Sequence, residues 1–414
     1  MVDIQTEFAK NPKSVNAMRV VERLHKENHQ AYLVGGCVRD LMLGKSPKDF
    51  DVATDVPPET VKALFNSARM VGRRFKIVHV RFGRDIIEVT TFRAPAKENE
   101  GEVSEGGMLL SDNVWGSFEQ DAMRRDFTIN ALYFNPQTNQ ITDLVKGMGD
   151  IEAKLIRLIG DPETRYREDP VRMLRAARFE AKLQFDIEKQ TAAAMKRLGF
   201  LLQDIPAARL FEEALKLFMS GYGEASYHSL IKHELLGWLF PDTANAEPNF
   251  APQLIQLALA STDKRISQSK PVTPAFVLAA LLWWPFVAEK KRLVDAGETH
   301  LAASHEAALN VISKQQLFTS IPKRFSGPMR DIWHLQSRLP NTKGKKPAVL
   351  MGHKRFRAAY DFLLLREESG EKLDNLGAWW TNFQEENPIE QTSSPEDSRG
   401  PARRPRKRRP KKTT

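Results

Sequence analysis

Segments with the composition of β-strands are confined to the first 135 residues of this 414-residue chain. Short runs there are rich in β-branched and aromatic residues and are bounded by Gly, Pro or Asp, a pattern typical of strands. They lie at residues 31–36, 50–54, 76–82, 85–92 and 127–134, with helical stretches between them. We therefore expect residues 1–158 to form an α/β head, built on a mixed sheet with helices.

From about residue 160 the pattern becomes helical. In residues 207–218 the apolar side chains follow the i, i+3, i+4, i+7 spacing of one helix face, while Glu212, Glu213 and Lys216 fall opposite. The apolar run 274–288 is too short to span a bilayer, so we expect one buried core helix there and no integral membrane segment. The fold class expected is α+β, in which the head is followed by an all-α neck (159–250) and an all-α C-terminal region (251–385).

The net charge of +10 is concentrated at the C-terminus. Residues 399–414 contain nine Lys and Arg and no acid, which leaves 53 basic against 52 acidic residues in the remainder. A Pro-rich, aromatic-free segment cannot bury a core, so residues 386–414 are expected to be disordered. We interpret this tail as an arm that binds RNA phosphates, with a merely solubilising tail as the alternative.

Other features of the composition bear on the compartment. The single cysteine, Cys37, cannot pair within the chain, and the N-terminus lacks the basic start and apolar core of a signal peptide. Both favour a cytoplasmic protein. Residues 97–117 read as a long loop, which in a compact domain is more often functional than structural.

Two acids separated by one residue, Asp49 and Asp51, occur in the expected strand 50–54 and just before it. Side chains two apart point to one face of a strand, so the two carboxylates would project together while Phe50 and Val52 face a core. Two such close charges repel, and a divalent cation between them would remove the conflict. Mg²⁺ prefers hard oxygen ligands such as these carboxylates. If this Asp-x-Asp motif stood alone, the alternative would be that Asp49 and Asp51 are simply solvent-exposed acids on an edge strand.

The residues upstream favour the metal site. Gly35 and Gly36 end an apolar run and precede a helical segment, where backbone N–H groups can approach an anion. A Gly-Gly turn followed by a same-face acid pair is more specific than either feature alone. The chain has no P-loop motif, and "GMGDIE" at 147 breaks the dinucleotide fingerprint at its last glycine.

Three blocks, "LVGGCVRDLMLGKSPKDFDVAT", "RRDFTINALYF" and "RYREDPVRMLRAARF", resemble the class II nucleotidyltransferases. This superfamily includes bacterial poly(A) polymerases and tRNA CCA-adding enzymes. The resemblance implies that the Gly-Gly and Asp-x-Asp elements bind the triphosphate and two Mg²⁺ ions, for which Mn²⁺ can substitute. It places the metals on Asp49 and Asp51, and the nucleotide on Gly35, Gly36 and Arg39.

The resemblance also implies a third catalytic acid and arginines near the nucleotide. In the Arg-Arg-Asp element, Asp126 is the favoured third acid and Arg124 a nucleotide-binding residue. Glu88, in the run 85–92, is the alternative to Asp126 because many members of the superfamily carry an acid there. A surface salt bridge from Asp126 to Arg124 or Arg125 is the structural alternative.

The third block predicts a helix whose arginines need anionic partners. Asp169 before Pro170 is typical of a helix N-cap, and Arg172, Arg175 and Arg178 recur at i+3 spacing. The resemblance implies that Asp169 and Arg172 pair with the incoming base and that Arg178 lies at the nucleotide. A carboxylate and a guanidinium match adenine, but cytosine presents the same donor and acceptor order.

Residues 201–223 and the C-terminal region resemble the poly(A) polymerase branch of the superfamily. This implies template-independent transfer of AMP from ATP to RNA 3′ ends, in RNA processing and turnover. It also implies that helices of the neck (159–250) bind the nucleotide and RNA, and that the C-terminal region (251–385) binds RNA. A tRNA CCA-adding enzyme is the nearest alternative, and a non-catalytic RNA-binding scaffold is the alternative of another class. Protein partners cannot be inferred from the sequence.

Overall fold

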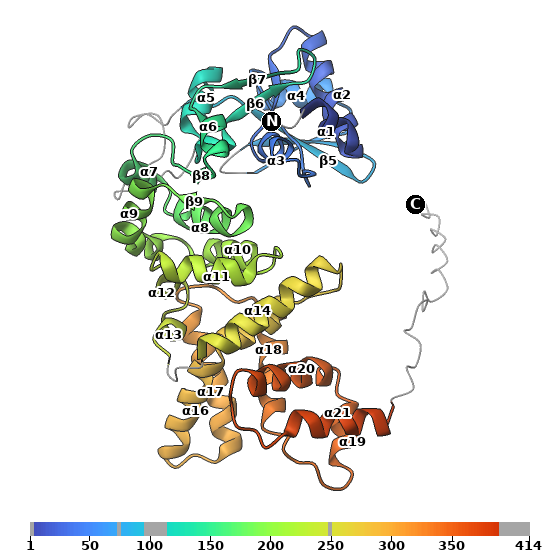
Figure 1. Ribbon diagram of the computed structural model, residues 1–414, viewed down its shortest axis with the longest axis vertical. Helices are drawn as coiled ribbons and strands as arrows, with labels where there is room; N and C mark the ends of the chain where they lie inside the picture. The colour runs from blue at the N-terminus through green and yellow to red at the C-terminus, as the bar shows by residue number, and fades with distance from the viewer. Residues whose placement is uncertain (1–3, 73–75, 95–113, 247–250, 389–414) are drawn as a thin grey trace, which may run out of the picture.

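The structure is a computed structural model that describes residues 4–72, 76–94, 114–246 and 251–388. A sheet-containing head lies at one end of an elongated molecule, and a column of helices extends away from it (Figure 1). The predicted tail and most of the predicted loop 97–117 lie outside the described residues. The prediction of an α+β fold, with the main sheet at the N-terminus and helices after it, is confirmed.

The head alternates helices and strands. In chain order its elements are α1 (Ile4–Lys10), α2 (Pro12–Lys26), β1 (Ala31–Val34), α3 (Gly36–Met42), β2 (Asp51–Thr54), α4 (Pro58–Leu64), β3 (Ala68–Val71), β4 (Ile77–Phe82), β5 (Asp85–Thr91), α5 (Phe118–Arg124), a 3₁₀ turn (Thr128–Asn130), β6 (Leu132–Asn135), β7 (Gln140–Asp143), α6 (Gly147–Glu152) and β8 (Leu155–Ile156).

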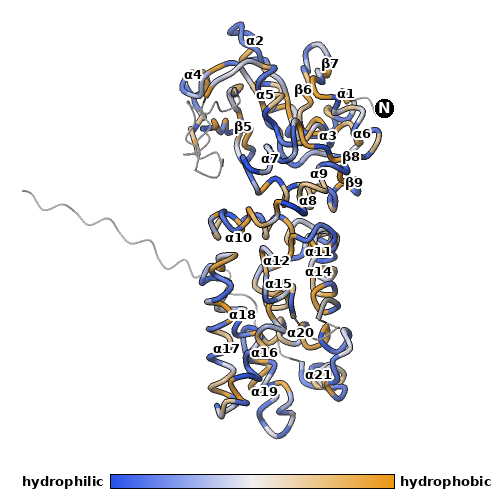
Figure 2. Tube along the Cα trace, turned by 90° about the vertical axis from the view of Figure 1, so that its left-hand side faces the viewer, coloured by the Kyte–Doolittle hydropathy of each residue, from blue (hydrophilic) through white to orange (hydrophobic). Residues whose placement is uncertain are grey.

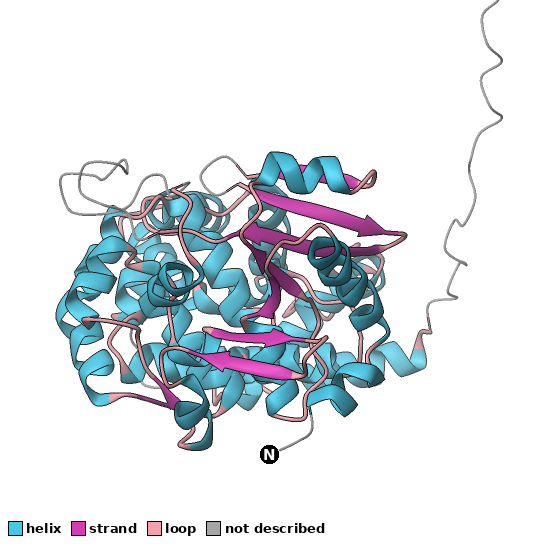
Figure 3. Ribbon diagram, turned by 90° about the horizontal axis from the view of Figure 1, so that it is seen from above, coloured by secondary structure: helices cyan, strands magenta, loops and turns pink. Residues whose placement is uncertain are grey.

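In the described part of the chain, seven strands form one mixed sheet in the order β3-β4-β5-β2-β1-β6-β7. Within this sheet, β2 and β5 are parallel and every other described pair is antiparallel. Figure 3 shows these strands crossing the head among its helices. Both faces of the sheet are buried: Leu33 and Val52 join the main core, whereas Val34 and Ala53 pack with Tyr133 on the other face.

The remainder is helical except for β9 (Asp186–Ile187), which pairs with β8. Figure 2 shows hydrophobic segments along the whole column of helices. These helices are α7 (Pro162–Glu168), α8 (Val171–Leu183), α9 (Lys189–Leu198), a 3₁₀ segment (Gly199–Asp204), α10 (Ala207–Phe218), α11 (Gly223–Lys232), α12 (Leu236–Leu239), α13 (Pro241–Ala244), α14 (Ala251–Ser267), α15 (Pro274–Leu281), α16 (Trp283–Asp295), α17 (His300–Gln315), α18 (Lys323–Gln336), α19 (Lys346–Met351), α20 (Phe356–Glu368) and α21 (Leu376–Glu386).

One expected strand and one expected helix differ in detail, and two strands were not expected. The run 127–134 begins with the 3₁₀ turn, and only its second half is β6. The polar strands β3 and β7 lacked a recognisable pattern. In α10 the prediction that Glu213 lies on the outer face is wrong: its side chain is buried and accepts a hydrogen bond from Lys216 Nζ at 2.7 Å.

The run 274–288 is buried as predicted, but it forms two helices, α15 and α16, separated at Leu282. The cause is Pro285, which has no N–H to donate to the carbonyl of Leu281, four residues earlier. That carbonyl instead accepts a hydrogen bond from Thr243 Oγ1 at 2.7 Å, which ties α13 to the break. No helix in the described part of the chain is long and apolar enough to cross a membrane.

Candidate active site

Two carboxylates stand side by side on the two parallel strands of the sheet. Asp51 begins β2 and is in register with Glu88 on β5. Burial, followed by the charge of Glu88, raises the pKa of Asp51 from 3.8 to about 6, although Arg125 opposes the shift. Two carboxylates therefore lie close together at the start of β2, with His79 Nε2 3.4 Å from Glu88 Oε1.

Asp49 lies outside the strand. Its side chain is 80% exposed, and its Oδ1 lies 3.7 Å from Lys13 Nζ. The charge of Asp49 still contributes to the raised pKa of Asp51. Phe50 and Val52 are buried as predicted, so the alternation of a strand already governs which side chains face the core.

The glycines preceding α3 lie beside two arginines. Gly35 has φ 79° and ψ −132°, a backbone conformation that only glycine adopts readily. A Cβ at Gly35 would lie 3.7 Å from Arg125 Nη1, and one at Gly36 would lie 3.5 Å from Arg39 Nη2. The Gly-Gly turn therefore places backbone next to two guanidinium groups, one of which also faces Asp51.

A chain of hydrogen bonds links this turn to the helices. Arg39 Nη1 donates to Asn130 Oδ1 at 2.5 Å, and Asn130 Nδ2 donates to Asp126 Oδ1 at 3.2 Å. Asp126 Oδ2 accepts from Nε of Arg175 on α8 at 2.8 Å. Burial opposes the ionisation of Asp126, but Arg175 outweighs it and lowers the pKa of Asp126 to about 2. Both oxygens of Asp126 are therefore occupied by protein groups.

Arg124 and Arg125 share another acid. Nε of Arg124 lies 3.3 Å from Asp121 Oδ1, and Nη2 of Arg125 donates to Asp121 Oδ2 at 2.9 Å. Tyr133 donates its hydroxyl hydrogen to the same carboxylate at 2.7 Å. This network fixes Arg125 on the sheet face that carries Asp51.

Asp169 does not cap α8 with its side chain, contrary to the N-cap expectation. Its Oδ2 accepts from Arg209 Nη2 on α10 at 2.8 Å. The other two atoms of this pair, Asp169 Oδ1 and Arg209 Nη1, are buried and have no partner in the described structure. A buried acceptor and a buried donor without partners cost stability unless a ligand satisfies them.

The arginines of α8 have separate partners. Arg172 Nη1 donates to Glu168 Oε2 and to the carbonyl of Arg165, so its guanidinium is engaged away from Asp169. Arg178 lies 4.7 Å from the ring centroid of Phe179. Arg39 and Arg175 contact the same ring, which makes Phe179 a shared platform for three of the site's arginines.

Sequence reasoning placed both arginines of the Arg-Arg-Asp element near the nucleotide but named only Arg124 as a nucleotide-binding residue. It missed Asn130, Phe179 and Arg209. These three carry no local signal, since their contacts come from segments distant in the sequence.

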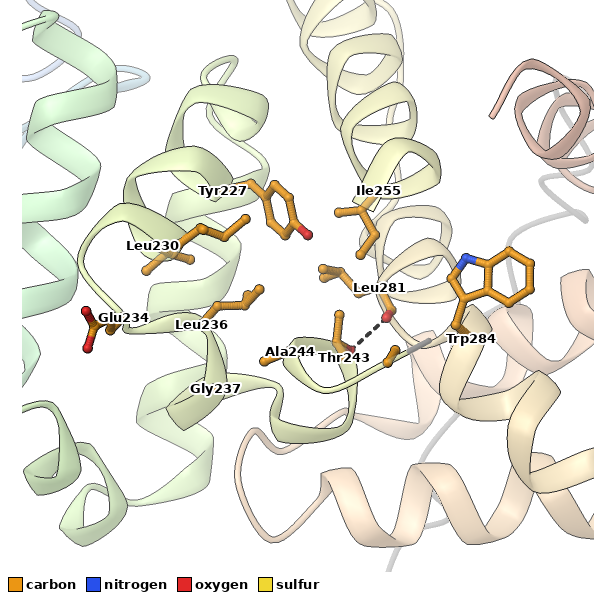
Figure 4. A pocket seen from close by; sticks show the side chains of 12 residues that line it. Tyr227, Leu230, Glu234, Leu236, Gly237, Thr243, Ala244, Ile255, Leu281 and Trp284 are labelled. Atoms are coloured by element: carbon orange, nitrogen blue, oxygen red, sulfur yellow. Dashed lines mark hydrogen bonds between the residues drawn. The ribbon is translucent and has the colours of Figure 1, made fainter. Parts of the chain in front are cut away.

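Among the described residues, no three His, Cys, Asp or Glu side chains form a ready metal cluster. The pocket drawn in Figure 4 is also separate from the charged site. It has a volume of about 340 Å³, is lined mainly by apolar residues between α11 and α16, and contains the Thr243 hydroxyl already bonded to Leu281. It offers little to a charged substrate.

Comparison with known families matches three parts of the chain. Residues 31–157 match the Poly A polymerase head domain, and residues 184–247 match the "probable RNA and SrmB-binding site of polymerase A". Residues 296–413 match the "polymerase A arginine-rich C-terminus". The matched head contains the Gly-Gly turn, both acids of the motif and Glu88.

Comparison with individual proteins agrees with these family matches. Poly(A) polymerase I of Escherichia coli O157:H7 is 46% identical over 96% of this chain and 89% of its own length. The CCA-adding enzyme of Bacillus pumilus is 37% identical over only 54% of this chain and 55% of its own length. Among solved structures, the Thermotoga maritima CCA-adding enzyme complexed with tRNA-CCA has a TM-score of 0.58 at 20% identity, covering 91% of this chain and 80% of its own. That likeness shows the fold alone.

Proposed function

The chain belongs to the bacterial poly(A) polymerase I family, and we propose that it transfers AMP from ATP to RNA 3′-hydroxyl ends without a template, releasing pyrophosphate. The observation that carries this proposal is the extent of the match, which reaches 96% of the chain for a poly(A) polymerase. The match to a CCA-adding relative stops at about half of the chain. A role in RNA processing and turnover, in the cytoplasm, remains part of the proposal.

The acids at the start of β2 fit a magnesium site. Asp51 and Glu88 supply hard oxygen ligands in register, and Asp49 lies two residues before Asp51 in the chain. Burial and the charge of Glu88 raise the pKa of Asp51, and a bound cation would oppose both effects. Mg²⁺ completes its shell with water and substrate phosphates, so a ready cluster of three protein ligands is not required. When bound, two such ions would lower the pKa of the attacking 3′-hydroxyl and neutralise the triphosphate, with Mn²⁺ as a substitute.

The chain's own residues hold the triphosphate. Arg125 lies beside Gly35, where a cation and close backbone can both reach phosphate oxygens. Arg39, beside Gly36, is buried and donates to Asp40 and Asn130, so its contribution to nucleotide binding would be to hold the turn in place. We propose that Arg125 takes the position that the sequence had suggested for Arg124. The hydrogen bonds of Arg125 to Asp121 hold it in place before substrate arrives.

We propose that the base is recognised by Asp169 together with Arg209. The unpartnered Oδ1 of Asp169 can accept from the amino group of adenine, and the unpartnered Nη1 of Arg209 can donate to the neighbouring ring nitrogen. Both atoms are shielded from solvent, so the base must displace the side chains that cover them. Arg172 was expected in this role, but its bonds to Glu168 and Arg165 favour Arg209. This pairing selects against G and U but does not separate A from C.

The role of Asp126 stays a prediction. As a metal ligand it would have to release Arg175 from Oδ2, whereas Glu88 already lies beside Asp51. Comparing Asp126→Asn with Glu88→Gln separates the two possibilities. The variant that lacks a metal ligand should need several-fold more Mg²⁺ for half-maximal rate. The other should keep the wild-type Mg²⁺ dependence.

The test of the activity supplies ATP or CTP separately to an oligo(A) primer and to a tRNA lacking its 3′ end. We expect long A tails on the generic primer with ATP. Addition of CCA followed by arrest on the tRNA would identify a CCA-adding enzyme instead, and no incorporation at all would identify a scaffold. Asp51→Asn should abolish incorporation, while Asp55→Asn, the matched loss of a nearby exposed acid, should not.

A further inference from the structure

A groove in the column of helices lies apart from the site described above. It has a volume of about 550 Å³ and runs between the C-terminal end of α14, the segment leading into α15, and the start of α20. Figure 1 shows α14 crossing the column below the neck, with α20 beside it. The groove therefore opens on a part of the molecule that extends away from the head.

Cations line both walls of the groove. The lining includes six basic residues and two acidic ones, Asp361 and Glu368. Asp361 is already paired with Arg357 Nε at 3.0 Å. The basic residues are Lys264, Arg265, Lys270, Lys354, Arg355 and Arg357.

Several of these cations are available to a ligand. Lys264, Lys270 and Lys354 are exposed and form no ion pair with any described residue. Nε of Arg355 is buried without a hydrogen-bond partner in the described structure. Arg265, by contrast, donates to the carbonyl of Pro271. Apart from Arg357, five cations of the lining have no acidic partner among the described residues, and Glu368 is the one acid of the lining outside an ion pair. The groove therefore carries a net positive charge that suits a polyanion.

The groove also has apolar surface at its base. Val272, Phe276, Leu364 and Leu365 are partly buried and lie between the two basic walls. Basic walls that follow a phosphate backbone, combined with an aromatic or apolar surface for bases, are how proteins hold single strands without reading sequence. An acidic protein would satisfy the charges but would make less use of the apolar base.

We propose that this groove binds the backbone of the RNA substrate upstream of the 3′ end being extended. The inference rests on the proposed function and adds a second RNA contact to it. One wall, residues 354–368, lies in the part matched as the arginine-rich C-terminus. The other wall, residues 261–276, lies outside all three matched parts. The groove joins the two walls into one surface.

The test compares a triple variant, Lys264→Gln, Lys270→Gln and Lys354→Gln, with a control triple, Lys62→Gln, Lys291→Gln and Lys314→Gln. Both remove three exposed cations, but the control residues lie outside the groove. Affinity for a long oligo(A) of about 30 nucleotides and a short one of about 6 is measured by fluorescence anisotropy across a salt series without ATP. Each lost phosphate contact should reduce the single-strand salt slope by about 0.7.

For the groove variant we expect about tenfold weaker binding of the long oligo(A), with a salt slope lower by about 2. Binding of the short oligo(A) and AMP incorporation into it should match wild type. Unchanged binding of the long oligo(A), or equal weakening with both lengths, overturns the proposal. So does loss of polyglutamate binding with RNA binding intact, which would identify an acidic protein partner. Absence of AMP incorporation by the wild-type chain would refute the proposed activity and leave the binding comparison valid.

Discussion

At the scale of single residues, the pair Asp169 and Arg209 differs from the site's other ion pairs because each partner keeps an unused, buried polar atom. In the ion pairs of Asp121 and Asp126, the oxygens of both carboxylates already accept hydrogen bonds from protein groups. These pairs hold other side chains in place. An unmet donor and acceptor next to each other match the edge of an adenine. The proposed recognition of the base therefore rests on the two atoms that this pair leaves unbonded.

Asp169→Asn tests this recognition. The change keeps the size of the side chain but replaces a charged acceptor, and hydrogen bonds to charged groups contribute about 1.5–3 kcal/mol. We expect kcat/KM for ATP to fall by roughly 10- to 100-fold, mostly through KM, and the preference for ATP over UTP to narrow. Arg209→Lys should act in the same direction. Arg197→Lys, which alters an exposed ion pair on α9, is the control; unchanged discrimination in Asp169→Asn would contradict the assignment.

Residue types could be predicted from the sequence, but their partners could not. The Asp-x-Asp motif locates Asp51 without revealing that strand register sets Glu88 beside it. The Arg-Arg-Asp motif locates Asp126 without revealing that Arg175 occupies its carboxylate. Register and helix docking depend on contacts between distant segments, and no local pattern encodes them.

At the scale of elements, the break between α15 and α16 shows how one proline alters a predicted helix. The carbonyl of Leu281 loses its helical donor at Pro285 and gains the hydroxyl of Thr243. Both groups are buried, so the bond fixes α13 against the junction. The apolar composition of residues 274–288 predicted their burial, but the position of the break depended on this one missing N–H.

Thr243→Val removes the hydroxyl at nearly constant volume and leaves the buried carbonyl of Leu281 without a donor. We expect a loss of about 1–3 kcal/mol in the free energy of unfolding. Thr243→Ser keeps the hydroxyl donor, so its loss in the free energy of unfolding should be clearly smaller than that of Thr243→Val. Urea unfolding measures both, and a Val variant as stable as the Ser variant would show that the bond is dispensable.

The contact between α8 and α11 depends on Glu180. Its Oε2 accepts from His233 Nε2 at 2.9 Å and from the hydroxyl of Ser229, and its Oε1 accepts from Lys232 at 2.7 Å. Burial opposes ionisation, but these donors outweigh it and lower the pKa of Glu180 to about 2. A carboxylate with a lowered pKa stabilises the fold above its unfolded pKa, and this stabilisation disappears as the pH falls through the folded value.

Glu180→Gln should therefore destabilise the protein at pH 7 by about 3 kcal/mol, since the pKa falls from 4.5 to about 2 and each unit corresponds to about 1.4 kcal/mol. The deficit should shrink between about pH 4.5 and pH 2, where the wild-type carboxylate becomes protonated. Urea unfolding at several pH values measures it. Glu234→Gln, which removes an exposed acid on the same side of the neck, should show little change at any pH. A deficit for Glu180→Gln that is constant from pH 7 to pH 2 would contradict the role of its charge.

At the scale of the whole molecule, composition predicted the division into a sheet-containing head and a helical column. The way the head attaches to the column could not be predicted, because it depends on pairs between distant segments. Asp126 bonds Arg175, and Arg165 Nη2 donates to the carbonyls of Arg124 and Arg125. These bonds hold α7 and α8 of the neck against the head, so the candidate site forms only when head and neck are docked.

The charge of the whole chain is nearly balanced apart from residues 399–414, and this gives the last prediction. If the nine cations of that segment contact RNA phosphates, deleting it should weaken RNA binding and flatten its salt dependence, because fewer counterions are released. Replacing the nine basic residues with Gln at unchanged length should have the same effect, since charge rather than length is responsible. Binding of a long oligo(A) across a salt series measures both variants. A salt slope equal to wild type in both would show that the segment serves only solubility, and the groove beside α14 would then account for RNA binding outside the active site.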